Sequence, residues 1–192
     1  MSGNEKTNTL ILMLIGVVAL LMVAIIGLFV RMNQLQNEIL TSLASLQTGE
    51  TQAMGLAVGT HAPAFTLPAV DGSMISLQDF AAQRVLLGFS SIQCPACTQM
   101  YPSLKAFSRQ RQDIQIILIS RGTFEENQQL AEVQGFSFPV LTLTEDNLEV
   151  GQDYQVPGTP FFYVINEQGI VCNTGFANTQ EHLESLLNGC RQ

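Results

Sequence analysis

The chain has 192 residues, of which 46% are hydrophobic and 12% are charged, so it has room for one ordinary domain and an additional segment. Sixteen acidic residues against eight basic ones give a formal net charge of -8, which argues against binding to nucleic acid and against electrostatic docking on anionic lipid. The sequence contains no glycine-rich phosphate loop, and we expect no cofactor.

Residues 10–30 account for much of the low charge content, because they contain no charged residue and no proline. A helix over this stretch would cross about 30 Å of hydrocarbon. A cleaved signal peptide would have a shorter apolar core, of about 7–15 residues, followed by a small-x-small cleavage site. Neither feature is present, so we expect one uncleaved transmembrane anchor.

The basic residues around this anchor indicate its orientation. Lys6 and the N-terminal amine precede it, Arg31 follows it, and the next basic residue is Arg84. The positive-inside rule therefore favours a cytoplasmic N-terminus over residues 1–9. The main domain is then expected on the periplasmic or extracellular side of the inner (cytoplasmic) membrane.

Residues 31–56 are predicted to form a helical stalk and linker. Apolar side chains recur there at helical spacing, at Met32, Leu35, Ile39, Leu43 and Leu46. Both a short dimeric coiled coil and a single helix fit this pattern, and the small number of clean heptads favours the single helix. A stretch rich in Gly, Thr and Gln then leads into the main domain, expected over residues 57–192.

From residue 57 onward, strand and helix patterns alternate. The stretches that predict strands are residues 62–77 (two strands about an Asp71-Gly72 turn), 84–91, 114–120, 139–143, 159–166 and 170–173. The stretches that predict helices are the segment after Cys94, residues 124–135, and a last helix from Asn178 to Gly189.

The last helix and the order of the elements indicate the fold. Asn178 with Glu181 three residues on has the pattern of a capping box, and Cys190 follows Leu183 and Leu187 at helical spacing, so Cys190 is expected to face the core. A β-α-β half, a β-hairpin and a final helix are the order of a thioredoxin-like fold. We predict an α/β three-layer sandwich of this type with an N-terminal β-hairpin extension.

Residues 94–97 read Cys-Pro-Ala-Cys. If the preceding strand ends near Ser91, Cys94 lies at the start of the next helix, and Pro95 occupies the first helical position, where its missing N–H costs nothing. Free backbone N–H groups and the positive end of the helix dipole favour a thiolate at Cys94. Cys97 lies on the same helix face. This arrangement suits thiol–disulfide exchange, in which Cys94 attacks and Cys97 resolves the mixed disulfide.

Two other interpretations of the pair are weaker. A zinc site needs two further ligands, and the remaining candidates are not paired at a metal-binding spacing: they are His61, His182, Cys172 and Cys190. Packing alone, with two inert core cysteines, does not explain why the pair stands between a strand and a helix. We therefore predict no metal ligands.

Three motifs, in order, carry a family resemblance: "VGTHAPAFTLPAVDGSMISLQDF", "LLGFSSIQCPACTQMYPSL" and "VPGTPFFYVINEQGIV". Together they resemble membrane-anchored thioredoxin-like proteins of the TlpA/ResA and redoxin type. Within that group, the Cys-Pro-x-Cys site, the N-terminal anchor and the "HLESLL" ending are most similar to methylamine-utilisation accessory proteins of the MauD type. The resemblance covers about residues 58–187.

The resemblance implies roles for several residues. Pro160 matches a cis-proline that faces the paired cysteines, which would leave the backbone of Thr159 free to pair with an extended substrate strand. Gln93 and Pro95, which flank Cys94, are expected to contact substrate as well. Pro102 matches a proline that kinks the helix.

The sequence also departs from thioredoxins. Gln93 stands where they carry Trp, and Gly88 stands where they carry a buried acid that helps to deprotonate the second cysteine. We infer from these departures a dedicated partner rather than a general reductase.

Other activities on the same fold fit less well. The PxxxTxxC motif of a peroxiredoxin would need Pro at 87 and Thr at 91, where this chain has Leu87 and Ser91. A copper-delivery module would call for CxxxC and a distant His on a loop. A non-catalytic assembly factor is the remaining alternative.

Cys172 and Cys190 are candidates for a structural disulfide that closes a loop of about 19 residues and contributes about 3 kcal/mol. Two unpaired thiols, a relay of electrons and a link between subunits remain as alternatives. Such a bond would agree with an exported domain, because disulfides rarely persist in the cytosol.

The sequence thus predicts a membrane-tethered thiol–disulfide oxidoreductase. Its expected partners are an exported protein with a cysteine pair, the membrane, and a redox protein that recycles the dithiol.

Overall fold

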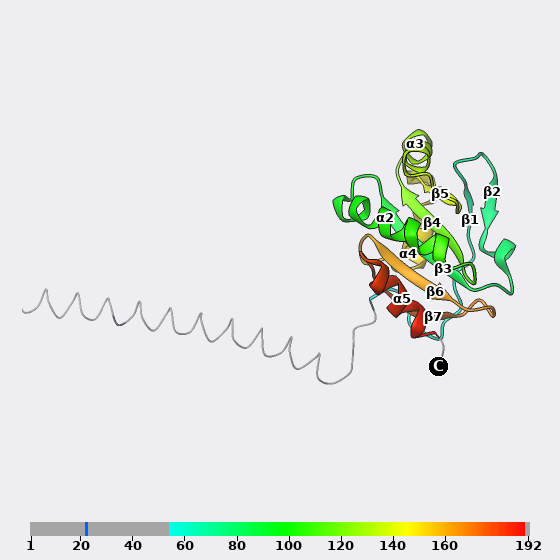
Figure 1. The fold of residues 1–192 in the computed structure, drawn as a ribbon, viewed down its shortest axis with the longest axis vertical. Coiled ribbons are helices and arrows are strands. Elements are labelled where there is room, and N and C mark those ends of the chain that lie inside the picture. The colour runs from blue at the N-terminus through cyan, green and yellow to red at the C-terminus, as the bar shows by residue number, and fades with distance from the viewer. Residues whose placement is uncertain (1–21, 23–53, 191–192) are drawn as a thin grey trace, which may run out of the picture. The chain divides into compact units, whose positions relative to one another are not determined.

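The computed structural model of the chain describes Met22 and residues 54–190 (Figure 1). Apart from Met22, the expected anchor and most of the expected stalk lie outside these residues. Within the part that the structure describes, no helix combines the length and apolar character that a membrane crossing requires.

A five-stranded sheet with the order β5-β4-β3-β6-β7 forms the centre of the domain. Its strands are β3 (Val85–Ser91), β4 (Gln115–Arg121), β5 (Val140–Leu143), β6 (Phe161–Ile165) and β7 (Val171–Phe176). The first three are parallel to one another, whereas β6 is antiparallel to β3 and β7 is antiparallel to β6. The continuous apolar runs predicted to be buried strands are thus the centre of this sheet, and the prediction is confirmed.

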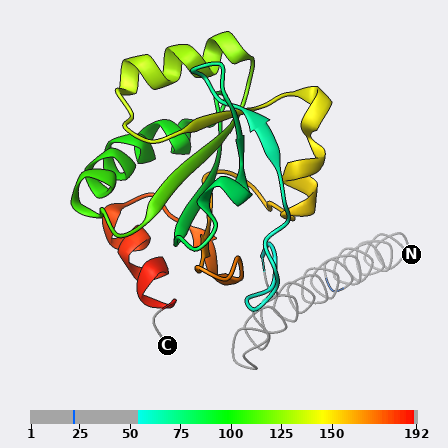
Figure 2. The same ribbon diagram turned by 90° about the vertical axis from the view of Figure 1, so that its right-hand side faces the viewer.

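Helices cover both faces of the sheet. They are α2 (Pro95–Gln110), α3 (Phe124–Gln134), α4 (Glu149–Asp153) and α5 (Gln180–Asn188), with short 3-10 turns η1 (Leu77–Phe80) and η2 (Glu145–Asn147). One side of the sheet packs against α2, α3 and α5, and the other against α4 and the N-terminal hairpin (Figure 2). The three layers and the thioredoxin-like order of elements match the predicted fold class.

The N-terminal hairpin consists of β1 (Thr66–Pro68) and β2 (Met74–Ser76), paired antiparallel about the predicted turn. Gly72 in this turn has φ +86°, a conformation that glycine adopts without strain. Leu67 of β1 is 1% exposed and packs on the core. The hairpin therefore closes one face of the sheet.

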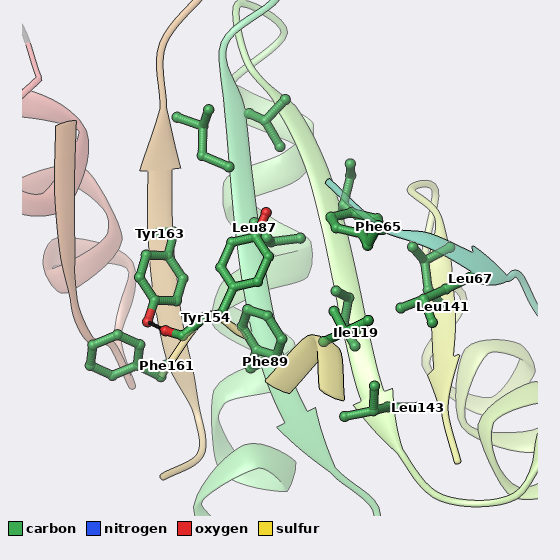
Figure 3. Packing of buried hydrophobic residues seen from close by; sticks show 14 of the residues in the cluster. Phe65, Leu67, Leu87, Phe89, Ile119, Leu141, Leu143, Tyr154, Phe161 and Tyr163 are labelled. Carbon is green, nitrogen blue, oxygen red and sulfur yellow. Dashed lines mark hydrogen bonds between the residues drawn. The ribbon is translucent and has the colours of Figure 1, made fainter. Parts of the chain in front are cut away.

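Aromatic side chains fill the core beneath this hairpin (Figure 3). The hydroxyl of Tyr154 donates to the Pro63 carbonyl at 2.7 Å, and the hydroxyl of Tyr163 donates to the Tyr154 carbonyl. Both polar tips of these buried rings are therefore satisfied, as burial requires. Gly55 and Leu56 already pack against this core, although the main domain was expected to begin at residue 57.

The predicted start of the last helix is wrong by one residue. Thr179, not Asn178, is the N-cap, and its side chain accepts from the backbone N–H of His182 at 3.3 Å. Since His182 rather than Glu181 stands three residues after the cap, no carboxylate completes a capping box. Asn178 instead donates its backbone N–H to the His182 ring at 3.4 Å. As predicted, Cys190 packs against the core cluster that contains Leu183 and Leu187.

Candidate active site

Cys94 is the N-cap of α2. Its backbone is extended (φ -96°, ψ 107°), and its Sγ accepts from the backbone N–H of Cys97 at 3.1 Å. Pro95 occupies the first turn, as predicted. A sulfur in this position meets backbone N–H groups of the first turn and the positive end of the helix, and both favour its negatively charged form.

The structure pairs Cys94 with Cys97 in a disulfide whose Cα atoms are 5.2 Å apart. Cys97 is completely buried, while Cys94 is partly exposed and Gln93 and Pro95 on either side of it are exposed. Only Cys94 can be reached from solvent. This asymmetry fits an attacking sulfur and a recessed partner.

Thr159 and Pro160 lie beside Cys94, although they are far from it in sequence. The Thr159-Pro160 bond is cis, and the Thr159 carbonyl oxygen is 3.4 Å from the Cys94 Sγ. Thr159 is partly exposed and Pro160 is buried. The backbone of Thr159 therefore lies directly beside the reactive sulfur, and an extended peptide could contact both the Thr159 backbone and the Cys94 Sγ.

A hollow of about 510 Å³ opens next to Thr159, and we name it the Thr159 hollow. It is lined by Phe89, Ser90, Ser91, Arg121, Leu143, Leu148, Gly151, Gln152, Gln155, Val156, Gly158 and Thr159. The apolar residues of this lining come from β3, β5 and the segment around α4. A hollow of this size beside a reactive sulfur can hold side chains that flank a substrate cysteine.

A second hollow of about 440 Å³ adjoins Gln93, and it shares Ser91, Arg121 and Leu143 with the first. At their common border, Arg121 makes an exposed ion pair with Glu145 at 3.2 Å. Neither Arg121 nor the segment with α4 was among the predicted site residues. The sequence offered one signal for Arg121, which follows directly after a predicted buried strand. The carboxyl ends of parallel strands meet at one edge of the sheet, so a residue there is expected to lie near Cys94.

Gly88 occupies the place where thioredoxins carry a buried acid, and the structure shows what fills that space. A Cβ on Gly88 would stand 2.6 Å from the ring of Phe162 and 3.2 Å from Leu118. Within the described residues, the buried polar side chains other than tyrosines are Ser90, Ser120, Asn127 and Thr142, and none of them is acidic. Among these residues, then, no carboxylate is buried beneath Cys97.

The other predicted site residues lie apart from Cys94. Cys172 on β7 is paired with Cys190 after α5 in a second disulfide, and both residues are partly buried. His61 and His182 are exposed. No three His, Cys, Asp or Glu side chains gather in a metal-binding group within residues 54–190.

Comparison with known proteins agrees with this geometry. Residues 58–174 match the model of the AhpC/TSA family. Over 135 residues the chain is 32% identical to the methylamine utilization protein MauD of Methylorubrum extorquens, covering 68% of this chain and 62% of that protein. It is 28% identical to the thiol-disulfide oxidoreductase ResA of Geobacillus thermodenitrificans, covering 71% of this chain and 82% of that protein.

The fold is shared with solved structures as well. The thioredoxin domain of a thiol-disulfide oxidoreductase from Bacteroides vulgatus superimposes with a TM-score of 0.62 at 23% identity, over 68% of this chain and 97% of that domain. This likeness establishes the thioredoxin-like fold. The chain spans less than two thirds of the length of the MauD protein that it matches.

Proposed function

Since the chain belongs to the AhpC/TSA family, we propose that it is a thiol–disulfide oxidoreductase that works through Cys94 and Cys97. One observation carries the proposal: a partly exposed sulfur at a helix N-terminus, paired with a buried one and 3.4 Å from the backbone of Thr159. The name of ResA, which describes the same activity for that relative, supports the proposal.

The proposed exchange has two steps and transfers two electrons. The Cys94 thiolate attacks one sulfur of a substrate disulfide, forms a mixed disulfide and releases the other substrate sulfur as a thiolate. The Cys97 thiolate then attacks the Cys94 Sγ and releases the second substrate sulfur. Two electrons pass to the substrate, its two thiolates take up protons, and the Cys94–Cys97 disulfide forms. The same steps in reverse oxidise a substrate dithiol.

Substrate docking at the rim of Cys94 follows from the position of Thr159. Its backbone groups can pair with an extended segment that presents a cysteine to Cys94. Pro160 fixes the chain behind Thr159, while Gln93 and Pro95 flank the sulfur on the exposed side. The Thr159 hollow lies next to this edge and would receive a neighbouring substrate side chain.

The wider setting is part of the proposal. The apolar residues 10–30 would tether the domain to the inner membrane, and the weak bias of the basic residues would place the domain outside the cytoplasm. A disulfide between Cys172 and Cys190 suits that compartment. The substrate would then be a cysteine pair in an exported protein, and a separate redox protein would recycle the dithiol.

Trapping with Cys97→Ala tests the proposal. Without the resolving sulfur, the mixed disulfide at Cys94 persists, so the full chain should be recovered joined to its partner through a reducible bond. The matched control, Cys97→Ala with Cys94→Ser, should trap nothing. Wild-type protein should also reduce insulin or refold a scrambled substrate. No trapped species and no activity in either assay would refute the proposal, and efficient turnover of hydrogen peroxide instead would favour a peroxidase.

A further inference from the structure

A row of polar side chains lies buried behind the reactive pair. Ser90 of β3, Ser120 of β4 and Thr142 of β5 are neighbours in the strand register. Side chains along a strand alternate between its two faces, and these three lie on the face that packs against α2 and α3. Each is at most 3% exposed. A polar row in this place is unexpected, because the adjoining layers of the same face are apolar.

Tyr101 of α2 and Asn127 of α3 complete this group. The Asn127 side-chain amide donates to the Ser120 carbonyl at 2.9 Å and to the Thr142 hydroxyl at 3.4 Å. The Tyr101 hydroxyl lies close enough to the hydroxyls of Ser90 and Ser120 to be influenced by them, but no hydrogen bond is formed with either. Burial raises the pKa of Tyr101, and these two hydroxyls partly oppose that rise. We name Ser90, Tyr101, Ser120 and Asn127 the polar layer.

The polar layer has unused hydrogen-bonding capacity. Among the described residues, five buried side-chain nitrogen or oxygen atoms lack a hydrogen-bond partner, and four of them belong to this layer. They are Ser90 Oγ, Tyr101 Oη, Ser120 Oγ and Asn127 Oδ1. Buried polar groups are normally paired, and a group of unpaired ones calls for a functional explanation or for internal water.

The layer and Cys97 belong to the same buried side of the domain, between the sheet and α2. Tyr101 follows Cys97 by one helical turn, and both lie on the buried face of α2. Because side chains on a helix lean toward its N-terminus, Tyr101 reaches back under the turn that carries Cys97. Ser90 and Ser120 lie near the carboxyl ends of β3 and β4, and β3 leads directly into the start of α2.

Cys97 needs such a neighbour if the proposed exchange is correct. A fully buried thiol resists ionisation, and Phe162 fills the space above Gly88 where thioredoxins keep an acid. None of the charged or titratable residues on the surrounding elements is buried: they are Lys105 and Arg109 of α2, Arg121 of β4, Glu125, Glu126 and Glu132 of α3, and Glu181, His182 and Glu184 of α5. On this side of the sheet, the buried polar groups among the described residues are therefore hydroxyls and the Asn127 amide, with no charged group.

We propose that the polar layer stabilises the Cys97 thiolate during resolution of the mixed disulfide, with Tyr101 as the main donor and Ser90, Ser120 and Asn127 holding it in place. This inference rests on the proposed function. Cys97 gives up its proton and attacks the Cys94 Sγ as a thiolate, the bond between Cys94 and the substrate sulfur breaks, and the departing substrate sulfur takes up one proton, so that protons balance. Tyr101 is a positioning and donor residue that undergoes no net chemical change.

A two-step thiol assay tests this role in the full chain. One equivalent of 5,5'-dithiobis(2-nitrobenzoate) reacts with reduced Cys94 and releases a first thionitrobenzoate, and Cys97 then releases a second. In Tyr101→Phe the first release should stay within about twofold of wild type. The second should be about tenfold slower near pH 7, and its pH profile should move up by about one unit. Ser120→Ala should change the second release in the same direction by a smaller factor.

Tyr154→Phe is the matched control, because it removes a buried tyrosine hydroxyl on the opposite face of the sheet. Both releases should match wild type in this variant. An unchanged second release and pH profile in both Tyr101→Phe and Ser120→Ala would overturn the inference, as would equal slowing by Tyr154→Phe. A wild-type protein that shows no second release would instead refute the proposed exchange itself.

Discussion

The two disulfides of this domain have the same chemistry and opposite surroundings. Cys94 and Cys97 are three residues apart, at the helix N-terminus that follows Ser91 of β3. Cys172 and Cys190 are 18 residues apart and join β7 to the end of α5. The strand register places Cys172 beside the Val164–Leu86 pair, well back along β3 from the reactive pair. The sulfurs are alike, so position must decide what each bond does.

The reactive pair has features that the second pair lacks. Cys94 lies at a helix N-terminus, where its Sγ accepts from the Cys97 N–H. The Thr159 carbonyl and the Thr159 hollow lie next to it. Cys172 and Cys190 pack against the same apolar cluster as the reactive pair, but neither caps a helix N-terminus nor lines the Thr159 hollow. A short loop adds little stability when closed, whereas a longer one adds more. The first bond is therefore suited to exchange, and the second to holding the last helix on the sheet.

The largest expected effect separates the two pairs by activity. Cys94→Ser should lower disulfide exchange by more than roughly a thousandfold, because it removes the nucleophile. Cys172→Ser should leave the rate within about twofold at 25 °C, since it removes no group near Cys94. Insulin reduction by the full chain measures both. An equally large loss in Cys172→Ser would mean that electrons pass through the second pair.

The next effect separates the pairs by stability. Replacing both Cys172 and Cys190 with Ser should lower the free energy of unfolding by about 3 kcal/mol, because the unfolded chain regains the freedom of that loop. Replacing Cys94 and Cys97 with Ser should cost much less. Urea unfolding of the variants gives the comparison, and similar losses for the two double variants would contradict the assigned roles.

A third prediction concerns why the reactive pair has no buried acid. Gly88→Ala should cost about 1–3 kcal/mol of stability, because its Cβ would press on the ring of Phe162. Gly151→Ala is the control: its Cβ would meet only Leu143 at 3.6 Å, and alanine favours the helix by up to about 1 kcal/mol. Thermal unfolding measures both. A stable Gly88→Ala protein would show that Phe162 yields space for a larger residue.

The smallest expected effect concerns the ion pairs that hold α5, the helix before Cys190. Arg111 bonds Glu184 of α5 at 2.6 Å and Asp113 at 2.8 Å. The Arg111 hydrogen bond lowers the pKa of Asp113 from 3.8 to about 2. Because the folded pKa is depressed, this contribution to stability is present above about pH 4 and is lost as the pH falls through about 2.

Asp113→Asn should remove that acid-dependent contribution. The Asp113 side chain is 50% exposed, so the difference should be below about 1 kcal/mol after screening by solvent. Urea unfolding of wild type and variant between about pH 5 and pH 1.5 covers the range over which the contribution is lost. If the free energies of unfolding of wild type and variant differ by a constant amount over this interval, the ion pair of Asp113 with Arg111 makes no acid-dependent contribution to stability.

Local signals were sufficient to predict the strand before Cys94, Pro95 in the first turn of the helix, and the edge strand at residues 140–143. These features depend on apolar runs and helix-start residues that are neighbours in sequence. Asn178 and Thr179 are adjacent, however, and either residue type can cap a helix. The sequence did not show that the backbone N–H of His182 would donate to the side chain of Thr179 rather than to that of Asn178. The short helix α4 has too few residues to show a period, so sequence patterns missed it.

By itself, the sequence determined the fold class and the Cys94–Cys97 pair, because hydrophobic periodicity and helix-start signals depend only on residues that are close together in the sequence. The place of Thr159 beside Cys94 came only from a family resemblance, since no local pattern links residues 65 positions apart. Tertiary structure alone decided that Phe162 fills the space over Gly88 and that Arg121 borders both hollows. It also aligned Ser90 with Ser120 and brought Asn127 of α3 to Thr142 of β5, because strand register and helix packing bring together side chains that no regular sequence spacing connects.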